Sequence, residues 1–291
     1  MNKILIVALI FVTIACKTQS TISATNESQN SEEIVVIWPE GTQNTQLSQS
    51  EIDKIRSLLD VYYSGNKNAW AKSRAQIVAM GPAAKKALCL FFIKFFAAGR
   101  QSVGDLEKHW RASRYELSLL KEFSVPFLIS TMAIPKLGTT GKIQCSKTLA
   151  IIGSPAVPAL IENLGRGEPS FQRRIVETLG EIKDVKAITP LAALYNNQLN
   201  RVNDSDSQYG VRVYCMEALG KIRWNKESTT TVEKALSDPN KDVRKAAIEA
   251  AILMAASQNA HLLKKAQKTS RKDFPLSRYH SRIEVLLYAY K

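Results

Sequence analysis

The sequence is poor in histidine and in the short motifs that mark catalytic or metal sites. Only three histidines occur in 291 residues, and His109, His261 and His280 are scattered along the chain. A glycine-rich phosphate loop is absent, as are the H-E-x-x-H, G-x-S-x-G and C-x-x-C motifs. A general base needs a second group to orient it, and none stands beside these histidines. We therefore predict that the protein is not an enzyme, with no catalytic residues, no metal site and no cofactor.

Hydrophobic runs long enough to cross a membrane are absent too. Near the N-terminus, Asn2-Lys3 precedes an eleven-residue apolar run, Ile4–Ile14, whereas a membrane span needs about 20 residues. The run stops at Ala15-Cys16, which resembles the lipobox of bacterial lipoproteins, although Thr13 stands where that family usually has leucine. The resemblance implies a signal peptide over 1–15 and lipidation of the Cys16 thiol. An uncleaved anchor or an ordinary signal peptide is the alternative.

Cysteine is scarce in the rest of the chain. With Cys16 assigned to the lipid, Cys89, Cys145 and Cys215 remain, an odd number widely separated in sequence. This spacing excludes a disulfide framework. Cys89 and Cys215 lie in apolar helical patterns and are predicted to be buried thiols. One bridge, either Cys145 to Cys215 or Cys89 to Cys145, stays open as an alternative.

Large apolar residues are also rare from 16 to 50, where Ser, Thr, Asn, Gln and Glu dominate. Such a segment cannot bury enough apolar surface to offset the entropy of ordering it. We predict a lipidated, mostly disordered tether over 16–50. Ile34–Trp38 is its apolar exception and either forms a short strand or docks on the body. The chain as a whole is 45% hydrophobic, which is enough for a substantial core beyond the tether.

What the sequence does contain is an internal repeat. Three windows align without a gap: FQRRIVETLGEI from Phe171, VRVYCMEALGKI from Val211 and VRKAAIEAAILM from Val243. Each places apolar residues at i, i+4 and i+8, which form one stripe along a helix. A glutamate stands at one further shared position of the aligned windows, outside this stripe: Glu177, Glu217 and Glu249. The windows start 40 and 32 residues apart, and an insertion in the polar loop Asn196–Gly210 explains the difference from a period near 32.

Two fainter copies, QCSKTLAIIGSP from Gln144 and KSRAQIVAMGPA from Lys72, extend the repeat toward the N-terminus. In both, a glycine ends an apolar turn and a proline follows, as where one helix ends and the next begins. Each unit is therefore predicted to be a two-helix hairpin. The expected second helices are Pro82–Ala97, Pro155–Leu164, Ala187–Tyr195 and Thr229–Leu236.

The windows resemble the HEAT repeat, in particular its short bacterial form known as HEAT-like or PBS-lyase-like repeats. DVRKAAIEA at Asp242–Ala250 and VRVYCMEALGKI at Val211–Ile222 carry the resemblance best. It implies an all-α fold, an α-solenoid of stacked helical hairpins, whose long surface binds another macromolecule. The lyase in the family's name does not transfer, because the repeat occurs in many binding proteins. In that family the repeat arginine often pairs with an acidic residue near the start of the repeat helix, a role that Asp242 fits.

Positive charge exceeds negative charge, with a net +14, and two groups of basic residues form the candidate binding surface. The first group is Arg212 and Arg244, which occupy the same position of two repeat windows, together with Arg173 and Arg174, which follow that position in the window from Phe171. Arginines repeated in this way more typically form a ladder of internal ion pairs than a binding surface. The second lies in Asn259–Lys291, which holds eight basic against two acidic residues. Its candidate residues are Lys264, Lys265, Lys268, Arg271 and Lys272. Capping helices with solvated outer faces are the alternative there.

These features predict an exported, lipid-anchored solenoid that acts as a protein-binding or scaffold module in the bacterial cell envelope. Its expected partner is another protein or an anionic envelope component such as lipid headgroups, a lipopolysaccharide core or an acidic glycan. The outer membrane is the favoured location, because Lys17 follows Cys16 where enterobacterial inner-membrane lipoproteins have aspartate. Nucleic acid is disfavoured as a partner, because an exported chain rarely meets it.

The predicted organisation is a signal peptide (1–15), a tether (16–50), an N-terminal helical region with degenerate repeats (51–141), HEAT-like repeats (142–257) and basic capping helices (258–291). Two other functions stay open. One is an enzyme with a site around 100–140, where the repeat breaks and His109, Glu116 and Lys121 would converge. The other is a nucleic-acid-binding stack, if the N-terminal segment is not a signal.

Overall fold

The computed structural model describes the chain from the end of the predicted tether onward. The described residues are 42, 47–64, 66–97, 106–199, 209–222, 224–254, 259–275 and 277–289. They divide into two compact units, one ending at Ile152 and one beginning at Gly153. The predicted signal peptide, the lipidation site Cys16 and the segment Ile34–Trp38 lie outside the described residues.

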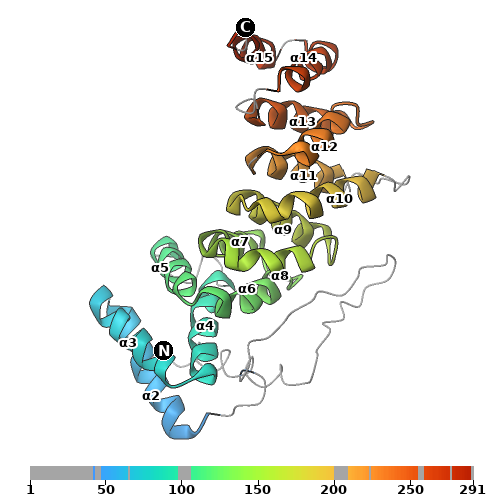
Figure 1. The fold of residues 1–291 in the computed structure, drawn as a ribbon. Helices are drawn as coiled ribbons and strands as arrows, with labels where there is room; N and C mark the ends of the chain where they lie inside the picture. Colours follow the sequence, from blue (N-terminus) through green and yellow to red (C-terminus); the bar gives the residue numbers. More distant parts are fainter. Residues whose placement is uncertain are drawn as a thin grey trace. The chain divides into compact units, whose positions relative to one another are not determined.

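Every element of the described residues is helical (Figure 1). The first unit holds α2 (Gln49–Asp60), η1 (Val61–Ser64), α3 (Lys67–Ala79), α4 (Pro82–Ala97), α5 (Leu106–Leu119), η2 (Lys121–Ser124), α6 (Val125–Met132) and α7 (Thr139–Ile152). The second unit begins with η3 (Ser154–Ala156), α8 (Val157–Glu162), α9 (Pro169–Ile182), η4 (Val185–Ala187) and α10 (Ile188–Leu199). It continues with α11 (Tyr209–Lys221), α12 (Lys226–Ala235), α13 (Lys241–Leu253), α14 (Ala260–Asp273) and α15 (Tyr279–Tyr288). No described helix is both long and apolar enough for a membrane span.

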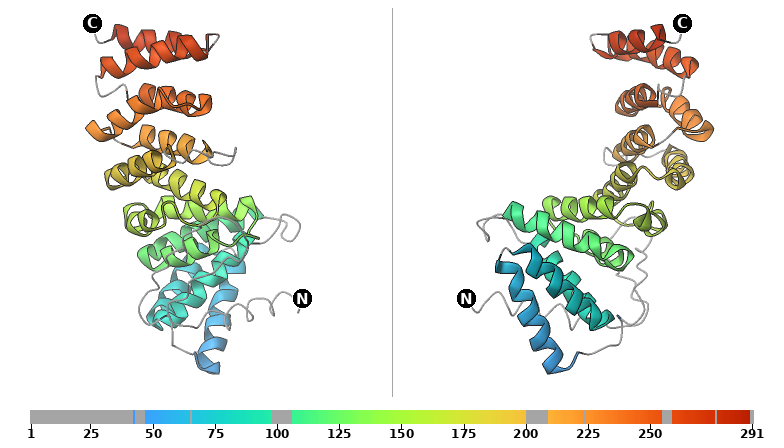
Figure 2. Two further views of the ribbon diagram at one scale, coloured as in Figure 1. Left: turned by 90° about the vertical axis from the view of Figure 1, so that its right-hand side faces the viewer. Right: turned by 60° about the vertical axis from the view of Figure 1, so that its left-hand side comes forward.

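The second unit confirms the predicted solenoid of stacked helical hairpins. Helices α9, α11 and α13 lie in one row, and α8, α10 and α12 lie in a second row beside it (Figure 2). The apolar stripe of the first repeat window, Phe171, Ile175 and Leu179, is completely buried. Successive repeats therefore share one continuous core, as the i, i+4, i+8 spacing predicts.

The predicted second helices are present with adjusted ends. Pro82–Ala97 is α4 as predicted, whereas the segment from Pro155 starts with a short 3-10 turn before α8. The region that fits no repeat column forms a further helix pair, α5 and α6. The predicted boundary between 141 and 142 falls inside α7, which packs against α4, α5 and α6 of the first unit. The copy that begins at Gln144 therefore contributes its first helix to one unit and its second helix to the other.

Four of the repeat windows have a glycine at the same position, namely Gly81, Gly153, Gly180 and Gly220, and this glycine column serves two different purposes. Gly81 and Gly153 have φ of +101° and +78°, which a residue with a side chain rarely adopts, so they close α3 and α7 as predicted. Gly180 and Gly220 instead lie inside helices α9 and α11. A Cβ at Gly220 would stand 2.8 Å from the Cα of Ala250, so the missing side chain lets α11 and α13 approach closely.

The three described cysteines, Cys89, Cys145 and Cys215, are free and buried. Burial raises the thiol pKa of each, to about 12 for Cys215. Cys89 and Cys215 are buried thiols, as their apolar patterns predict. The alternative of a bridge through Cys145 is wrong.

Candidate functional site

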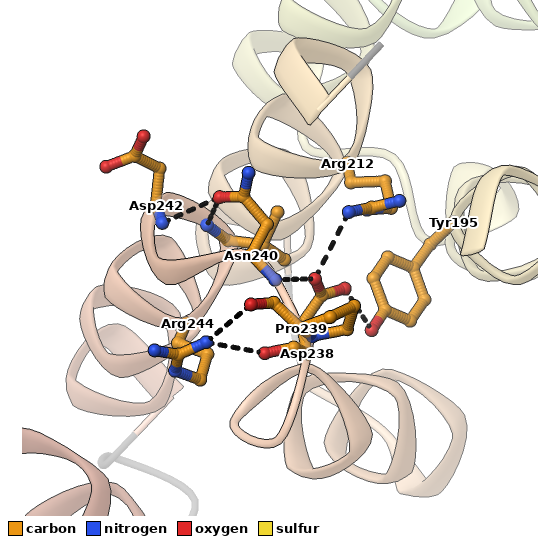
Figure 3. A network of polar contacts seen from close by, with 8 residues as sticks. Tyr195, Arg212, Asp238, Pro239, Asn240, Asp242 and Arg244 are labelled. Carbon is orange, nitrogen blue, oxygen red and sulfur yellow. Dashed lines mark hydrogen bonds and ion pairs between the residues drawn. The ribbon is translucent and has the colours of Figure 1, made fainter. Parts of the chain in front are cut away.

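The repeat arginine Arg212 lies in a buried polar network between α10, α11 and the turn before α13 (Figure 3). Its Nη2 donates to the Asp238 carboxylate at 3.2 Å. The Asn240 backbone N–H donates to the same carboxylate oxygen at 2.9 Å, and the Tyr195 hydroxyl donates to the other oxygen at 3.0 Å. Arg212 and Asp238 are each 3% exposed. A buried charge is tolerated only when it is paired and hydrogen-bonded, and this network meets both conditions.

Arg244 is the equivalent residue of the next repeat and is also used internally. Its Nε pairs with the Asp273 carboxylate at 2.5 Å, and its Nη1 donates to the backbone carbonyls of Asp238 and Pro239 at 2.8 and 2.9 Å. The guanidinium thus holds the turn before α13 against α14. The hydrogen bond from Arg244, together with the positive charge of the guanidinium, lowers the pKa of the Asp273 carboxyl group.

The expected pairing of these arginines with Asp242 is wrong. Asp242 is exposed in the first turn of α13, and Figure 3 shows its carboxylate pointing away from both guanidinium groups. Asp238, before the helix, pairs with Arg212 instead. The arginine column is therefore an ion-pair ladder, the use that the sequence favours, and it leaves Arg212 almost no exposed surface with which to contact a partner.

The other two candidates of this group, Arg173 and Arg174, lie on α9 and share one acidic partner. Arg173 Nε donates to Glu177 at 2.9 Å, and Arg174 Nη1 donates to the other Glu177 oxygen at 2.5 Å. Arg173 is the exposed member of the pair. Its guanidinium also stacks over the Tyr214 ring of α11, with 4.3 Å between the guanidinium carbon and the ring centroid.

Next to Tyr214, a shallow hollow of about 270 Å³ lies between α11 and α13. Its polar lining consists of Tyr214 and Glu217 from α11, and Asp242, Lys245 and Glu249 from α13. Three carboxylates thus face one ammonium group. The Glu249 carboxylate also accepts a hydrogen bond from the Tyr279 hydroxyl of α15 at 2.5 Å.

Glu217 is a half-buried carboxylate of this hollow, and burial perturbs its pKa. No described cation lies within 4.0 Å of its carboxylate, whereas Glu177 in the same repeat column has two arginine partners. Burial raises the pKa of Glu217 above its ordinary value, and the negative charges of Glu177 and Glu249 raise it further. Lys221 and Arg173 act in the opposite direction and lower this pKa, but the Lys221 ammonium pairs with Glu181 at 2.7 Å and the Arg173 guanidinium with Glu177 at 2.9 Å. The hollow therefore favours a ligand that brings a positive charge to Glu217.

The C-terminal candidates lie on α14 and divide into paired and unpaired residues. Lys265 pairs with Glu233 at 3.3 Å, and Arg271 pairs with Glu284 of α15 at 3.0 Å. The other three candidates, Lys264, Lys268 and Lys272, are exposed and form no ion pair with a described residue. The sequence identified these cations but did not single out Tyr214 or Lys245 beside the hollow.

The alternative site in the region 100–140 does not assemble. The Glu116 carboxylate is buried and accepts hydrogen bonds from Arg74 at 2.7 Å and from the Tyr62 hydroxyl at 3.3 Å. His109 stacks on the Phe95 ring, with 5.1 Å between centroids. Lys121 is exposed at the start of η2. The three predicted residues thus interact with different parts of the first unit rather than with one another.

No family model matches the chain, and no curated protein matches it. Among solved structures, it is similar to the complex of CpcE and CpcF of phycocyanin lyase from Nostoc sp. PCC7120. The match has 19% sequence identity and a TM-score of 0.46, and covers 56% of this chain and 97% of the other. The described part of the chain also lacks any group of three His, Cys, Asp or Glu side chains that would hold one metal ion.

This comparison overturns one prediction from the sequence. The scarcity of histidine and of catalytic motifs predicts that the protein is not an enzyme, but the matched structure is that of a lyase. We therefore withdraw the exclusion of enzymatic activity.

Proposed function

We propose that the protein is a binding module of the bacterial cell envelope that receives a basic side chain of a protein partner in the hollow between α11 and α13. The observation that carries the proposal is the half-buried carboxylate of Glu217, which no described cation pairs with. A carboxylate whose pKa is raised by burial gains most from an added cation, because pairing offsets its desolvation.

Size and lining favour a side chain over a free small molecule. Small-molecule pockets usually measure roughly 300–1,000 Å³ and enclose their ligand, whereas this hollow measures about 270 Å³ and is open. A lysine or arginine reaching in from a partner protein would place its charge near Glu217 and Glu249. Its aliphatic stem would lie along the Tyr214 ring, which already accepts a guanidinium on its Arg173 side.

The location of the module is part of the same proposal. The apolar run followed by Ala15-Cys16 supports export and lipid attachment at Cys16, and Lys17 favours the outer membrane. Labelling with a clickable fatty acid in cells that express the wild type or Cys16→Ala tests the anchor. Label that vanishes in the variant, with loss of the protein from the membrane fraction, is the expected result. Equal labelling of both chains would exclude Cys16 as the anchor.

Site-specific photo-crosslinking tests the hollow itself. A photoreactive amino acid at position 245 is expected to give one discrete crosslinked species in cells, and the same group at the exposed Val185 is not. Glu217→Lys should abolish that species, because it opposes a partner cation with a like charge. The matched control is Glu227→Lys, an equal charge reversal on α12. A crosslink that survives Glu217→Lys would refute the proposed site.

A further inference from the structure

The last helical hairpin, α14 and α15, carries an uncompensated positive stripe. Lys264, Lys268 and Lys272 follow one another at i, i+4 and i+8, so they lie one turn apart along one face of α14. All three are exposed, and none forms an ion pair with a described residue. The face opposite to Lys268 is buried and includes Leu263.

The two acidic residues of the hairpin form their ion pairs with arginines and not with this stripe, although the charge of Lys272 helps to lower the pKa of Asp273. The Asp273 carboxylate is held by Arg244 of α13, and the Glu284 carboxylate is held by Arg271. Two further basic residues of the hairpin, Arg278 and Arg282, are exposed near the start of α15. The hairpin therefore presents a net positive surface beyond its internal Arg271–Glu284 ion pair.

The same hairpin also exposes large apolar side chains. On α15, Val285 is 70% exposed and Tyr288 is 77% exposed, the highest exposures of any large hydrophobic residue described. They lie two and five residues after the fully buried Ile283, which places them on the face of α15 turned away from the core. Figure 1 shows α14 and α15 side by side at the C-terminal end of the second unit. Large apolar side chains exposed next to a basic surface are typical of a face that contacts another molecule.

We infer that this hairpin docks on an anionic lipid bilayer. Lysines one helical turn apart suit a surface of negatively charged headgroups, and an exposed tyrosine on the neighbouring helix suits the boundary between headgroups and acyl chains. A bilayer matches both the charge and the apolar contact without requiring a pocket. The inference stands apart from the lipid anchor at Cys16 and from the hollow at Glu217, since it concerns only α14 and α15.

A solvent-sensitive fluorophore at position 285 tests this docking. The full chain with Cys16→Ser and Val285→Cys is labelled, because the other three cysteines are buried. Vesicles containing phosphatidylglycerol should shift the emission to shorter wavelength, whereas pure phosphatidylcholine should not. The same fluorophore in a Val185→Cys chain should not respond to either vesicle. This readout reports the hairpin alone, so binding of the apolar N-terminal run cannot imitate it.

Charge reversal supplies the decisive comparison. Each lysine at an anionic surface strengthens binding by roughly fivefold, so Lys264→Glu, Lys268→Glu and Lys272→Glu together should weaken the response by a hundredfold or more. Three exposed lysines elsewhere in the second unit, Lys183, Lys186 and Lys226, provide the control set, and their reversal should leave the response in place. An unchanged response in the α14 triple variant would overturn the inference. So would an equal response to both kinds of vesicle, or a response to an acidic protein but to neither vesicle.

Discussion

Removing the Asp238 carboxylate should be among the most damaging single changes in the second unit. Asp238→Ala leaves the Arg212 guanidinium buried without its anionic partner, and it removes the acceptor of the Tyr195 hydroxyl and of the Asn240 N–H. Breaking a buried ion pair from one side costs about 3–5 kcal/mol, because the remaining charge is uncompensated. We expect a loss of about 4 kcal/mol in the free energy of unfolding. For a domain of this size, that corresponds to a fall of roughly 10–20 °C in Tm.

Urea denaturation followed by helical circular dichroism measures this loss, and Asp242→Ala is the matched control. Asp242 is exposed in the first turn of α13, where it contributes only through the helix dipole, about 0.3–1 kcal/mol. Comparison of the two variants thus tests whether the aspartate that pairs with Arg212 is Asp238, as observed, or Asp242, as the resemblance to the HEAT-like repeat implies. A loss below about 1 kcal/mol in Asp238→Ala, or an equal loss in both variants, would refute the assignment.

A double variant distinguishes lost pairing from lost packing. Asp238→Leu with Arg212→Met replaces both charges by apolar groups, and such replacements of buried pairs are often neutral. The double variant should therefore be more stable than Asp238→Ala alone. If the two substitutions add without coupling, the carboxylate and the guanidinium do not stabilise each other.

Three further changes test the packing and the hollow. Gly220→Ala should cost about 1–3 kcal/mol in urea denaturation, because its Cβ would press on the Ala250 backbone, and an unchanged midpoint would mean that α11 and α13 are not in close contact. Leu219→Asp buries a charge in the fully buried stripe of α11 and should lower both helical circular dichroism and Tm; a variant that melts like the wild type would contradict the repeat register. Glu217→Gln should stabilise the fold at pH 7, because the raised pKa of Glu217 means that the folded state disfavours the ionised carboxylate. The gain in stability should vanish below about pH 4, where Glu217 is protonated in both the folded and the unfolded wild type. A gain that persists at low pH would show that it does not come from the charge of Glu217.

The repeat fold was predictable because its signal is local in sequence. The burial of Phe171, Ile175 and Leu179 follows from their spacing on one helix, and the left-handed turn at Gly153 follows from the glycine before a proline. The repeated glycines alone do not predict that Gly180 and Gly220 allow neighbouring helices to approach closely. That role depends on which residue of the next repeat lies opposite each glycine, and the residue spacing within one helix does not specify this.

The partner of the repeat arginine was not predictable for a related reason. A consensus aligns Asp242 with the start of the repeat helix, but Asn240 already caps α13 by accepting from the N–H groups of Asp242 and Val243. Asp238, two residues earlier, is therefore free to turn inward toward Arg212. The choice depends on the three-dimensional path of the turn before α13, and sequence periodicity gives no information about that path.

Glu217 lacks a cationic partner among the described residues because α11 does not keep the two arginines that precede the equivalent glutamate in α9. In α9, Glu177 is preceded by Arg173 and Arg174, four and three residues earlier, and both pair with it. In α11, the equivalent positions are Val213 and Tyr214, so the aligned carboxylate loses both partners while the column itself is kept. A change in the neighbours of a retained residue thus leaves Glu217 without a described cationic partner.

An arginine placed in α11 at the position equivalent to Arg173 tests directly whether the carboxylate of Glu217 attracts the partner. Val213→Arg recreates the i, i+4 pair that Arg173 forms with Glu177, at a gain of about 0.3–0.5 kcal/mol in stability. It should also neutralise Glu217 from within the chain and abolish the crosslink from position 245 without unfolding the stack. Val213→Lys should act in the same direction, whereas Val213→Ile should keep the crosslink because it adds no charge. A crosslink that persists in Val213→Arg, with the fold intact, would mean that the free carboxylate does not attract the partner.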